Sequence, residues 1–136
     1  MATREEEAQQ WQIIGLNSRK AAQHFLDLEC YRSSVSRAYY AAYAAVTSEL
    51  VRQGITFGQG SNNPGHAGLP IYILNNLNML PITVRFEVNK SVRRMYRARI
   101  EADYVAAADM DKAAALRVLR DLSRILQLLG AEGGGS

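Results

Sequence analysis

The sequence predicts an all-α protein, an antiparallel bundle of four long helices and one short helix. Three observations support this fold class. The chain of 136 residues is 48% hydrophobic and has only 3 Pro. Ala and Leu, which favour helix, are plentiful, whereas Val, Ile and Thr do not dominate. Apolar residues recur at three- and four-residue spacings along most of the chain. We expect a single helical domain at 1–130, followed by a flexible Gly/Ser tail at 131–136.

The first two helices are expected at 4–30 and 33–53. The first has one apolar stripe, and the second has two stripes side by side. The two stripes consist of Val35, Tyr39, Ala42, Val46 and Leu50, and of Tyr40, Tyr43, Thr47 and Val51. A helix that is apolar on so much of its circumference belongs in the middle of a bundle. We expect Ser33 or Ser34 to cap its N-terminus and Gly54 to end it.

A long loop and a short helix are expected next. The segment 54–65 holds four Gly, two Asn and one Pro, which is typical of a mobile surface loop. The short helix is expected at 66–80, with Pro70 in its first turn and Pro81 closing the segment.

Two long helices are expected to complete the bundle. The segment 82–88 alternates apolar and polar residues and could form a strand, but no second strand is available to pair with it. We therefore expect a helix at 83–107. The last helix is expected at 109–129, where the apolar spacing is unbroken, and Gly130 is its stop signal.

The composition limits the function only broadly. The net charge of +3 and the pI near 9.2 permit RNA or DNA as a partner without requiring either. The single cysteine, Cys30, excludes a disulfide framework within the chain, and no Cys/His cluster has zinc-ligand spacing. We expect no metal or cofactor. The acidic, polar N-terminus and the lack of a long apolar run predict a cytoplasmic protein without a membrane partner.

Basic residues gather in one segment, 85–99, which holds six Lys and Arg against the single Glu87. Arg93 and Arg97 lie one helical turn apart and share a face. A neighbouring line consists of Lys90, Arg94 and Arg97, and the last helix adds Arg117, Arg120 and Arg124. Such stripes suit phosphate binding. The alternative is a solvated face whose charges are partly paired, with Glu101, Asp103 and Asp121 as the partners.

The histidines and one more arginine are further candidates. His66 follows the long loop, and it could cap a helix, bind a ligand or act as an acid or base; a structural role is the alternative. His24 fits an exposed helix position. Arg37, set among the Ala and Tyr residues of 36–45, is a candidate for phosphate contact. Buried Tyr hydroxyls need partners, which Arg37 or Asp103 could supply.

Three segments resemble those of HEPN domains. SSVSRAYYAAYAAVTSELVRQG, at 33–54, resembles the family's signature helix with its Ser-Arg-x-Tyr-Tyr-Ala pattern. GHAGLP, at 65–70, resembles its His-x-Gly segment, and MYRARIEADYV, at 95–105, resembles a later helix in which an Arg precedes Ala-Asp-Tyr. The three follow one another in the family's order. The resemblance implies a HEPN-like helical bundle that forms a homodimer.

The resemblance implies several functions. Many HEPN proteins are ribonucleases whose Arg and His, separated by four to six residues, meet those of a dimer mate. Others are partners of minimal nucleotidyltransferases in toxin–antitoxin pairs, and others are RNA-binding or scaffold domains. The resemblance places Arg37 at the signature arginine and expects its His at position 44, where this chain has Ala44. Arg19 and His24 have a ribonuclease spacing, but they lie in the first helix.

We therefore expect a HEPN protein of a prokaryotic defence or toxin–antitoxin system that binds RNA or nucleotide through a basic face and has degenerate catalysis. The expected binding residues are Arg37, Arg93, Arg94 and Arg97. One alternative is a metal-independent endoribonuclease toxin that uses Arg37 or Arg97 with His66. Another is a non-catalytic protein-interaction scaffold. The expected partners are a second copy of the chain and a nucleotidyltransferase-type antitoxin or another protein.

Overall fold

The computed structural model describes residues 2–130, which form five α-helices and one short 3₁₀ turn. The helices are α1 (Arg4–Asp27), α2 (Tyr31–Arg52), α3 (Leu69–Asn76), α4 (Ile82–Tyr104) and α5 (Lys112–Leu129), and the turn is η1 (Gly58–Gly60). No strand occurs in this part of the chain, so the alternating segment at the start of α4 is helical. The predicted all-α bundle is confirmed, and the expected tail at 131–136 lies outside the described residues.

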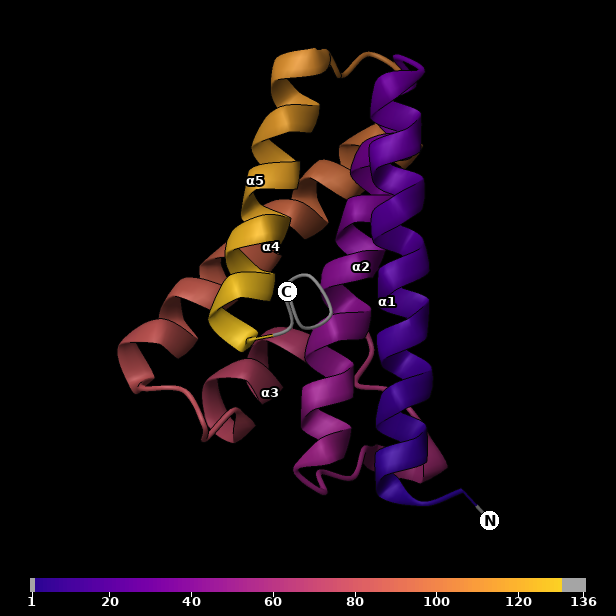
Figure 1. Ribbon diagram of the computed structural model, residues 1–136. Coiled ribbons are helices and arrows are strands. Elements are labelled where there is room, and N and C mark those ends of the chain that lie inside the picture. Colours follow the sequence, from indigo (N-terminus) through magenta and orange to yellow (C-terminus); the bar gives the residue numbers. More distant parts are fainter. Residues whose placement is uncertain (1, 131–136) are drawn as a thin grey trace.

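The helix α2 lies in the middle of the bundle, as its two apolar stripes predict. It packs against α1, α3, α4 and α5. In Figure 1, α1 and α2 run side by side in opposite directions, α5 lies beside them, and α3 lies at the lower left. The core residues Tyr39, Val46 and Leu50 of α2 are fully buried, together with Met95 of α4 and Ile125 of α5. None of these helices is long and apolar enough to cross a membrane.

The pair α1–α2 is held together by small residues and buried hydroxyls. A Cβ atom at Gly15 would lie 3.4 Å from the carbonyl oxygen of Ala41, so the two backbones approach closely there. Ser34 Oγ donates to the carbonyl of Ala22 at 2.8 Å, and Ser48 Oγ donates to a carbonyl of α1 at 2.7 Å. Both hydroxyls are buried and paired.

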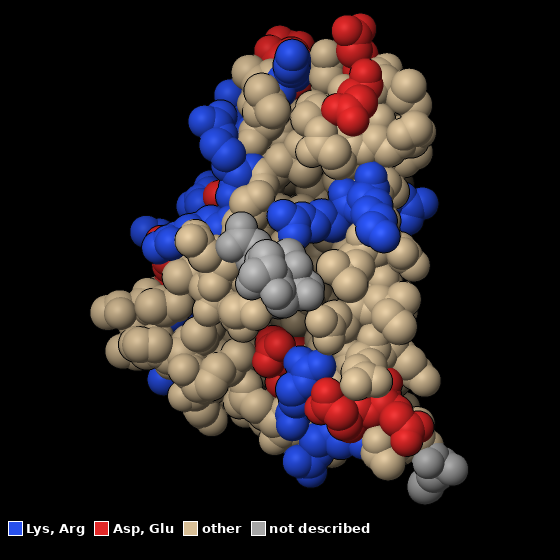
Figure 2. All heavy atoms as spheres, viewed as in Figure 1, with Lys and Arg blue, Asp and Glu red and all other residues tan. Residues whose placement is uncertain are grey.

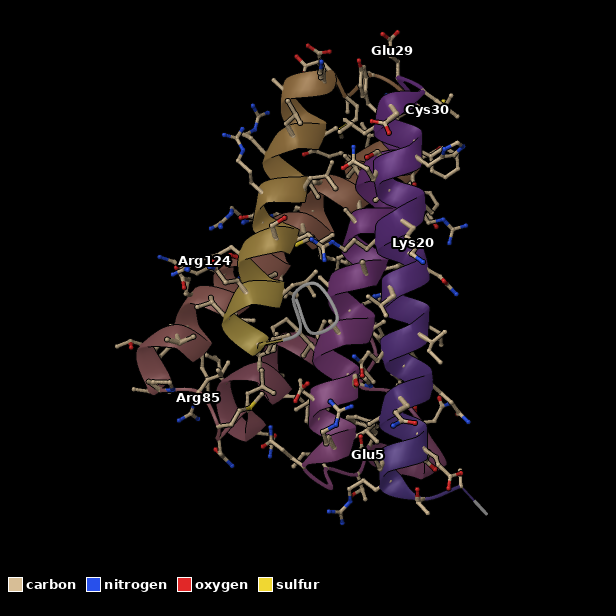
Figure 3. The ribbon with its side chains drawn as sticks, viewed as in Figure 1. Glu5, Lys20, Glu29, Cys30, Arg85 and Arg124 are labelled. Atoms are coloured by element: carbon tan, nitrogen blue, oxygen red, sulfur yellow. The ribbon has the colours of Figure 1, made fainter. Side chains whose placement is uncertain are left out.

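The prediction that Ser33 or Ser34 caps α2 is wrong. The helix begins two residues earlier than predicted, with Cys30 as its N-cap, and the side chain of Cys30 makes no capping hydrogen bond. Ser34 is buried inside the helix, where its hydroxyl faces α1 rather than the helix end. The turn between α1 and α2 requires Glu29 in the left-handed region, with φ 62°, and this is why α1 ends before Cys30. Glu29 and Cys30 lie at the upper end of this helix pair (Figure 3).

The other helix ends follow their sequence signals more closely. Gly54 has φ 82°, its amide donates to the carbonyl of Val51, and the amide of Ile55 donates to that of Leu50. These two bonds form a Schellman motif, which satisfies the last carbonyls of α2. Gly130 also has a positive φ, 71°, and ends α5 as predicted. The start of α5 is three residues later than expected, because Asp111 caps it.

Arg32 of α2 holds the C-terminal end of α4. The guanidinium of Arg32 donates to the carbonyl oxygens of the last turn of α4 and of the following loop, at distances between 2.8 and 3.2 Å. The acceptors are Glu101, Ala102, Val105, Ala106 and Ala108. The last four carbonyls of a helix have no partner within it, and a cation is favourable beside them. Arg32 therefore fixes α4 against α2.

Candidate functional site

His66 lies in a cage of four tyrosine rings. Tyr39, Tyr40 and Tyr43 come from α2, and their ring centroids are 5.5, 6.0 and 5.3 Å from that of His66. Tyr96 of α4 stacks on the imidazole, with 5.4 Å between centroids and 27° between planes. The predicted third helix is shorter than expected and begins at Leu69, so His66 precedes it and belongs to the loop.

Hydrogen bonds from two of these tyrosines hold the end of the loop in place. The hydroxyl of Tyr39 lies 2.8 Å from Nδ1 of His66. The hydroxyl of Tyr43 donates to Oδ1 of Asn63 at 2.6 Å and accepts from the amide of Gly65 at 2.9 Å. Neither Arg37 nor Asp103, the two partners suggested from the sequence, pairs with these hydroxyls, because the loop after α2 folds back over that helix and supplies the partners instead.

Arg99 occupies the other side of the tyrosine cluster. Its Nη2 donates to the hydroxyl of Tyr40 at 2.8 Å, and its guanidinium carbon lies 5.3 Å from the ring centres of Tyr40 and Tyr104. Its Nε lies 2.9 Å from Oδ2 of Asp103, but the N–H is not aimed at this oxygen, so the contact is ionic. Asp103 also accepts from Oγ of Ser36 at 3.1 Å. Arg99 is therefore committed to contacts within the fold.

Two clefts share His66 in their lining. The first, which we call the arginine cleft, is lined by Tyr39, His66, Ala67, Pro70, Val92, Arg93, Tyr96 and Arg97. The second, which we call the aromatic cleft, is lined by Trp11, Ile14, Tyr40, Tyr43, Ala44, Asn63, Gly65 and His66. His66 belongs to both. Ala44, the position at which the resemblance expects a histidine, faces the same space as His66.

The predicted phosphate-binding arginines divide between several surfaces. Arg93 and Arg97 are exposed in the arginine cleft, and neither forms an ion pair with any described residue. Arg94 faces α5, where its Nη2 lies 2.9 Å from Oδ1 of Asp121. This hydrogen bond raises the pKa of Arg94. Arg37 is exposed on α2 and lines neither cleft.

Two further basic residues, one at the start of α4 and one near the end of α5, have partners within the fold. Arg85, at the junction of α3 and α4 (Figure 3), donates to the carbonyls of Leu74 and Leu80. Arg124 lies 3.5 Å from a carboxylate oxygen of Glu87. Figure 2 shows mainly basic side chains along the edge beside α5, with small acidic patches among them. For these positions the alternative of a partly paired, solvated face describes the structure.

Burial sets the protonation of the site. The pKa of His66 is lowered, first by burial and then by the positive charge of Arg99. The pKa of Tyr39 is raised, first by burial and then by the neighbouring tyrosines. At neutral pH the imidazole is therefore uncharged and the Tyr39 hydroxyl keeps its proton.

The other candidate pair from the sequence, Arg19 and His24, lies away from the two clefts. His24 is exposed on α1 and Arg19 lines grooves beside α5, so this pair is remote from the two clefts. Within residues 2–130, no three His, Cys, Asp or Glu side chains gather in a way that could hold a metal ion. The sequence did not reveal the role of Asn63 or of the tyrosine cage. The only available signal was the spacing of Tyr39 and Tyr43, one turn apart, ahead of a loop that ends in His66.

The fold and the site define the chain as an all-helical domain with a small cationic cleft. The family model of the HEPN domain matches residues 8–132, and the chain belongs to this family. HEPN domains form a family of nuclease-like and RNA-binding domains. No curated protein sequence matches the chain.

Proposed function

We propose that this HEPN domain binds RNA through the arginine cleft and does not cleave it. The observation that carries the proposal is the meeting of His66, Arg93 and Arg97 in one cleft, from a loop and a helix that are distant in sequence. We further propose that the chain acts in a prokaryotic defence or toxin–antitoxin system, as a homodimer beside a nucleotidyltransferase-type partner. That second part rests on the family resemblance alone.

The charge of the cleft supports phosphate binding. Arg93 and Arg97 are exposed and lack carboxylate partners among the described residues, so they can contact phosphates without breaking an ion pair. Arginine offers a planar fork of donors that matches phosphate oxygens. Tyr96 lines the same cleft and adds an aromatic side chain, which a base can contact. These features favour a nucleic acid over an acidic protein.

The absence of a second proton-transfer group argues against cleavage. RNA hydrolysis without metal needs a group that titrates near neutrality, and histidine is the usual one. The position at which the resemblance expects histidine is Ala44, and Arg37 lies outside both clefts. Only His66 remains in the site, and its pKa is lowered by burial.

Salt-dependent RNA binding tests the proposal. Fluorescence anisotropy of a labelled single-stranded RNA is measured with the wild type and with Arg93→Ala and Arg97→Ala over a range of salt concentrations. Each substitution is expected to weaken binding and to reduce the slope of log K against log salt by about 0.7. Arg120→Ala, which removes the same charge from an exposed site on α5, is the matched control and should leave binding unchanged. Binding that ignores salt, or that Arg120→Ala weakens equally, would refute the proposed site.

Incubation of the wild type with labelled RNA and EDTA tests the absence of cleavage. We expect the RNA to stay intact. Cleavage that persists in EDTA and disappears in His66→Ala would show an endoribonuclease instead, with Arg97 as the neighbouring candidate group. If no RNA binds under any condition, a protein-interaction scaffold becomes the better description.

A further inference from the structure

We infer that Tyr39 holds His66 as the neutral tautomer that carries its proton on Nε2, so that His66 presents a hydrogen-bond donor to the clefts. This inference deepens the proposed function and rests on it for the identity of the ligand. It assigns Tyr39 as a positioning residue and gives His66 a binding role in place of a catalytic one.

The buried hydroxyl of Tyr39 fixes the direction of the hydrogen bond. The 2.8 Å contact with His66 can be made in two ways: the hydroxyl donates to the lone pair of Nδ1, or a protonated Nδ1 donates to the hydroxyl oxygen. Tyr39 is fully buried, and its hydroxyl has no other partner among residues 2–130. In the second arrangement its O–H would be buried without an acceptor, which native structures avoid. The hydroxyl therefore donates, and Nδ1 is unprotonated.

The charged imidazolium is excluded by the same bond. An imidazolium has protons on both nitrogens, so Nδ1–H would again displace the hydroxyl proton of Tyr39. Burial and the charge of Arg99 also disfavour a cation at this position, and both lower the pKa of His66. No carboxylate lines either cleft to offset them. The titratable and charged groups around the ring are Tyr39, Tyr40 and Tyr43 on α2 and Arg93, Tyr96, Arg97 and Arg99 on α4.

The remaining ring nitrogen is available to a ligand. Nε2 of His66 has no hydrogen-bond partner among the described residues, and it is not among the buried unpaired atoms, so it reaches solvent. With its proton it is a donor on a ring that lines the same cleft as Arg93 and Arg97, whose guanidinium groups are also donors only. A cleft lined by donors selects oxygen acceptors, and phosphate groups of RNA are the acceptors that also carry the matching charge.

The tautomer also gives a physical reason for the proposed lack of cleavage. A neutral Nε2–H has no lone pair with which to remove a proton from a ribose hydroxyl. It is also far too weak an acid to protonate a leaving oxygen near pH 7, where an effective group must titrate. His66 in this state can bind a phosphate but cannot move a proton at it.

Nitrogen NMR of the ring tests the inference directly. Long-range ¹H–¹⁵N correlation spectra are recorded at pH 7 on the ¹⁵N-labelled protein without RNA, with His66→Gln used to assign the signals. We expect the pattern of a ring with Nε2 protonated and Nδ1 bare. Tyr39→Phe, which keeps the ring and removes only the hydroxyl, should change this pattern toward a mixture of tautomers. Tyr40→Phe is the matched control, because its hydroxyl binds Arg99 instead, and it should preserve the Nε2–H pattern.

Several outcomes would overturn the inference. They are a proton on Nδ1 alone, an imidazolium at pH 7, or a pattern in Tyr39→Phe that equals the wild type. If Tyr39→Phe does not fold, the wild-type spectrum decides by itself. Because these spectra need no RNA, they are independent of the proposed function: failure of RNA binding would refute that function and leave the tautomer standing.

The donor role is tested by RNA affinity. A glutamine amide can donate from about the position of Nε2, so His66→Gln should bind RNA nearly as well as the wild type, while His66→Ala should lose about tenfold. Equal losses in both variants would contradict a donor role. A loss in neither variant would show that His66 does not touch the ligand.

Discussion

Removal of the guanidinium of Arg32 should destabilise the fold strongly, although the residue lines neither cleft. Arg32→Met keeps an unbranched apolar stem and removes the donors that hold the end of α4. The two shortest bonds, to Ala102 at 2.9 Å and to Ala108 at 2.8 Å, are partly buried. With about 1.5 kcal/mol for each charge-assisted bond of this kind, the free energy of unfolding should fall by about 3 kcal/mol.

Urea denaturation followed by circular dichroism measures this change. Arg32→Lys should have an intermediate free energy of unfolding. Its ammonium group keeps the charge but lacks the two separate NH₂ groups with which the guanidinium reaches its acceptors. Arg37→Met is the matched control on the same helix: Arg37 is exposed, so the change should stay within about 0.5 kcal/mol. A loss below about 1 kcal/mol in Arg32→Met would refute the view that these carbonyls depend on Arg32.

Three further predictions concern the loop and its histidine. Gly54→Ala should cost at least about 1 kcal/mol in a thermal melt, because φ is 82° and the new Cβ would lie 2.8 Å from the guanidinium of Arg4. Tyr43→Phe should speed hydrogen exchange of the Gly65 amide, which loses one of its acceptors, and unchanged exchange would contradict this role. Because the pKa of His66 is lowered in the folded protein, the unfolded chain binds a proton at this histidine more readily than the folded protein does. The free energy of unfolding should therefore be highest above pH 6.5 and should fall as the pH drops below that value. His66→Gln should flatten that part of the pH profile, measured by urea midpoints.

The main features of the fold could be predicted from local signals. The apolar stripes of α2 identified the central helix, because a helix buried on all sides must be apolar on all sides. Gly54 and Gly130 identified helix ends, because only glycine adopts positive φ there without strain. The start of α2 could not be predicted from Ser33 and Ser34, because a serine fits a helix end and a buried contact with a neighbouring helix equally well. At Ser34 the structure has the buried contact with α1, because tertiary packing outweighs the local capping signal.

The site could be predicted only in part, because it depends on how the long loop after α2 returns to the bundle. The periodicity of α4 correctly places Arg93 and Arg97 on one face, and the structure adds His66 to that face. The spacing also grouped Arg94 with them, whereas Asp121 of α5 draws it to another surface. Neither the cage around His66 nor its bond to Tyr39 follows from spacing, since 27 residues separate the two partners.

The most direct test of the central claim is RNA binding by the double variant Arg93→Ala/Arg97→Ala compared with Arg117→Ala/Arg120→Ala, which removes the same charge from α5. Both pairs are exposed, so neither should affect folding by more than about 1 kcal/mol. Loss of salt-dependent RNA binding in the first double variant, with wild-type binding in the second, is the predicted result. Equal loss in both, or binding that survives in the first, would contradict the claim that the arginine cleft is the RNA site.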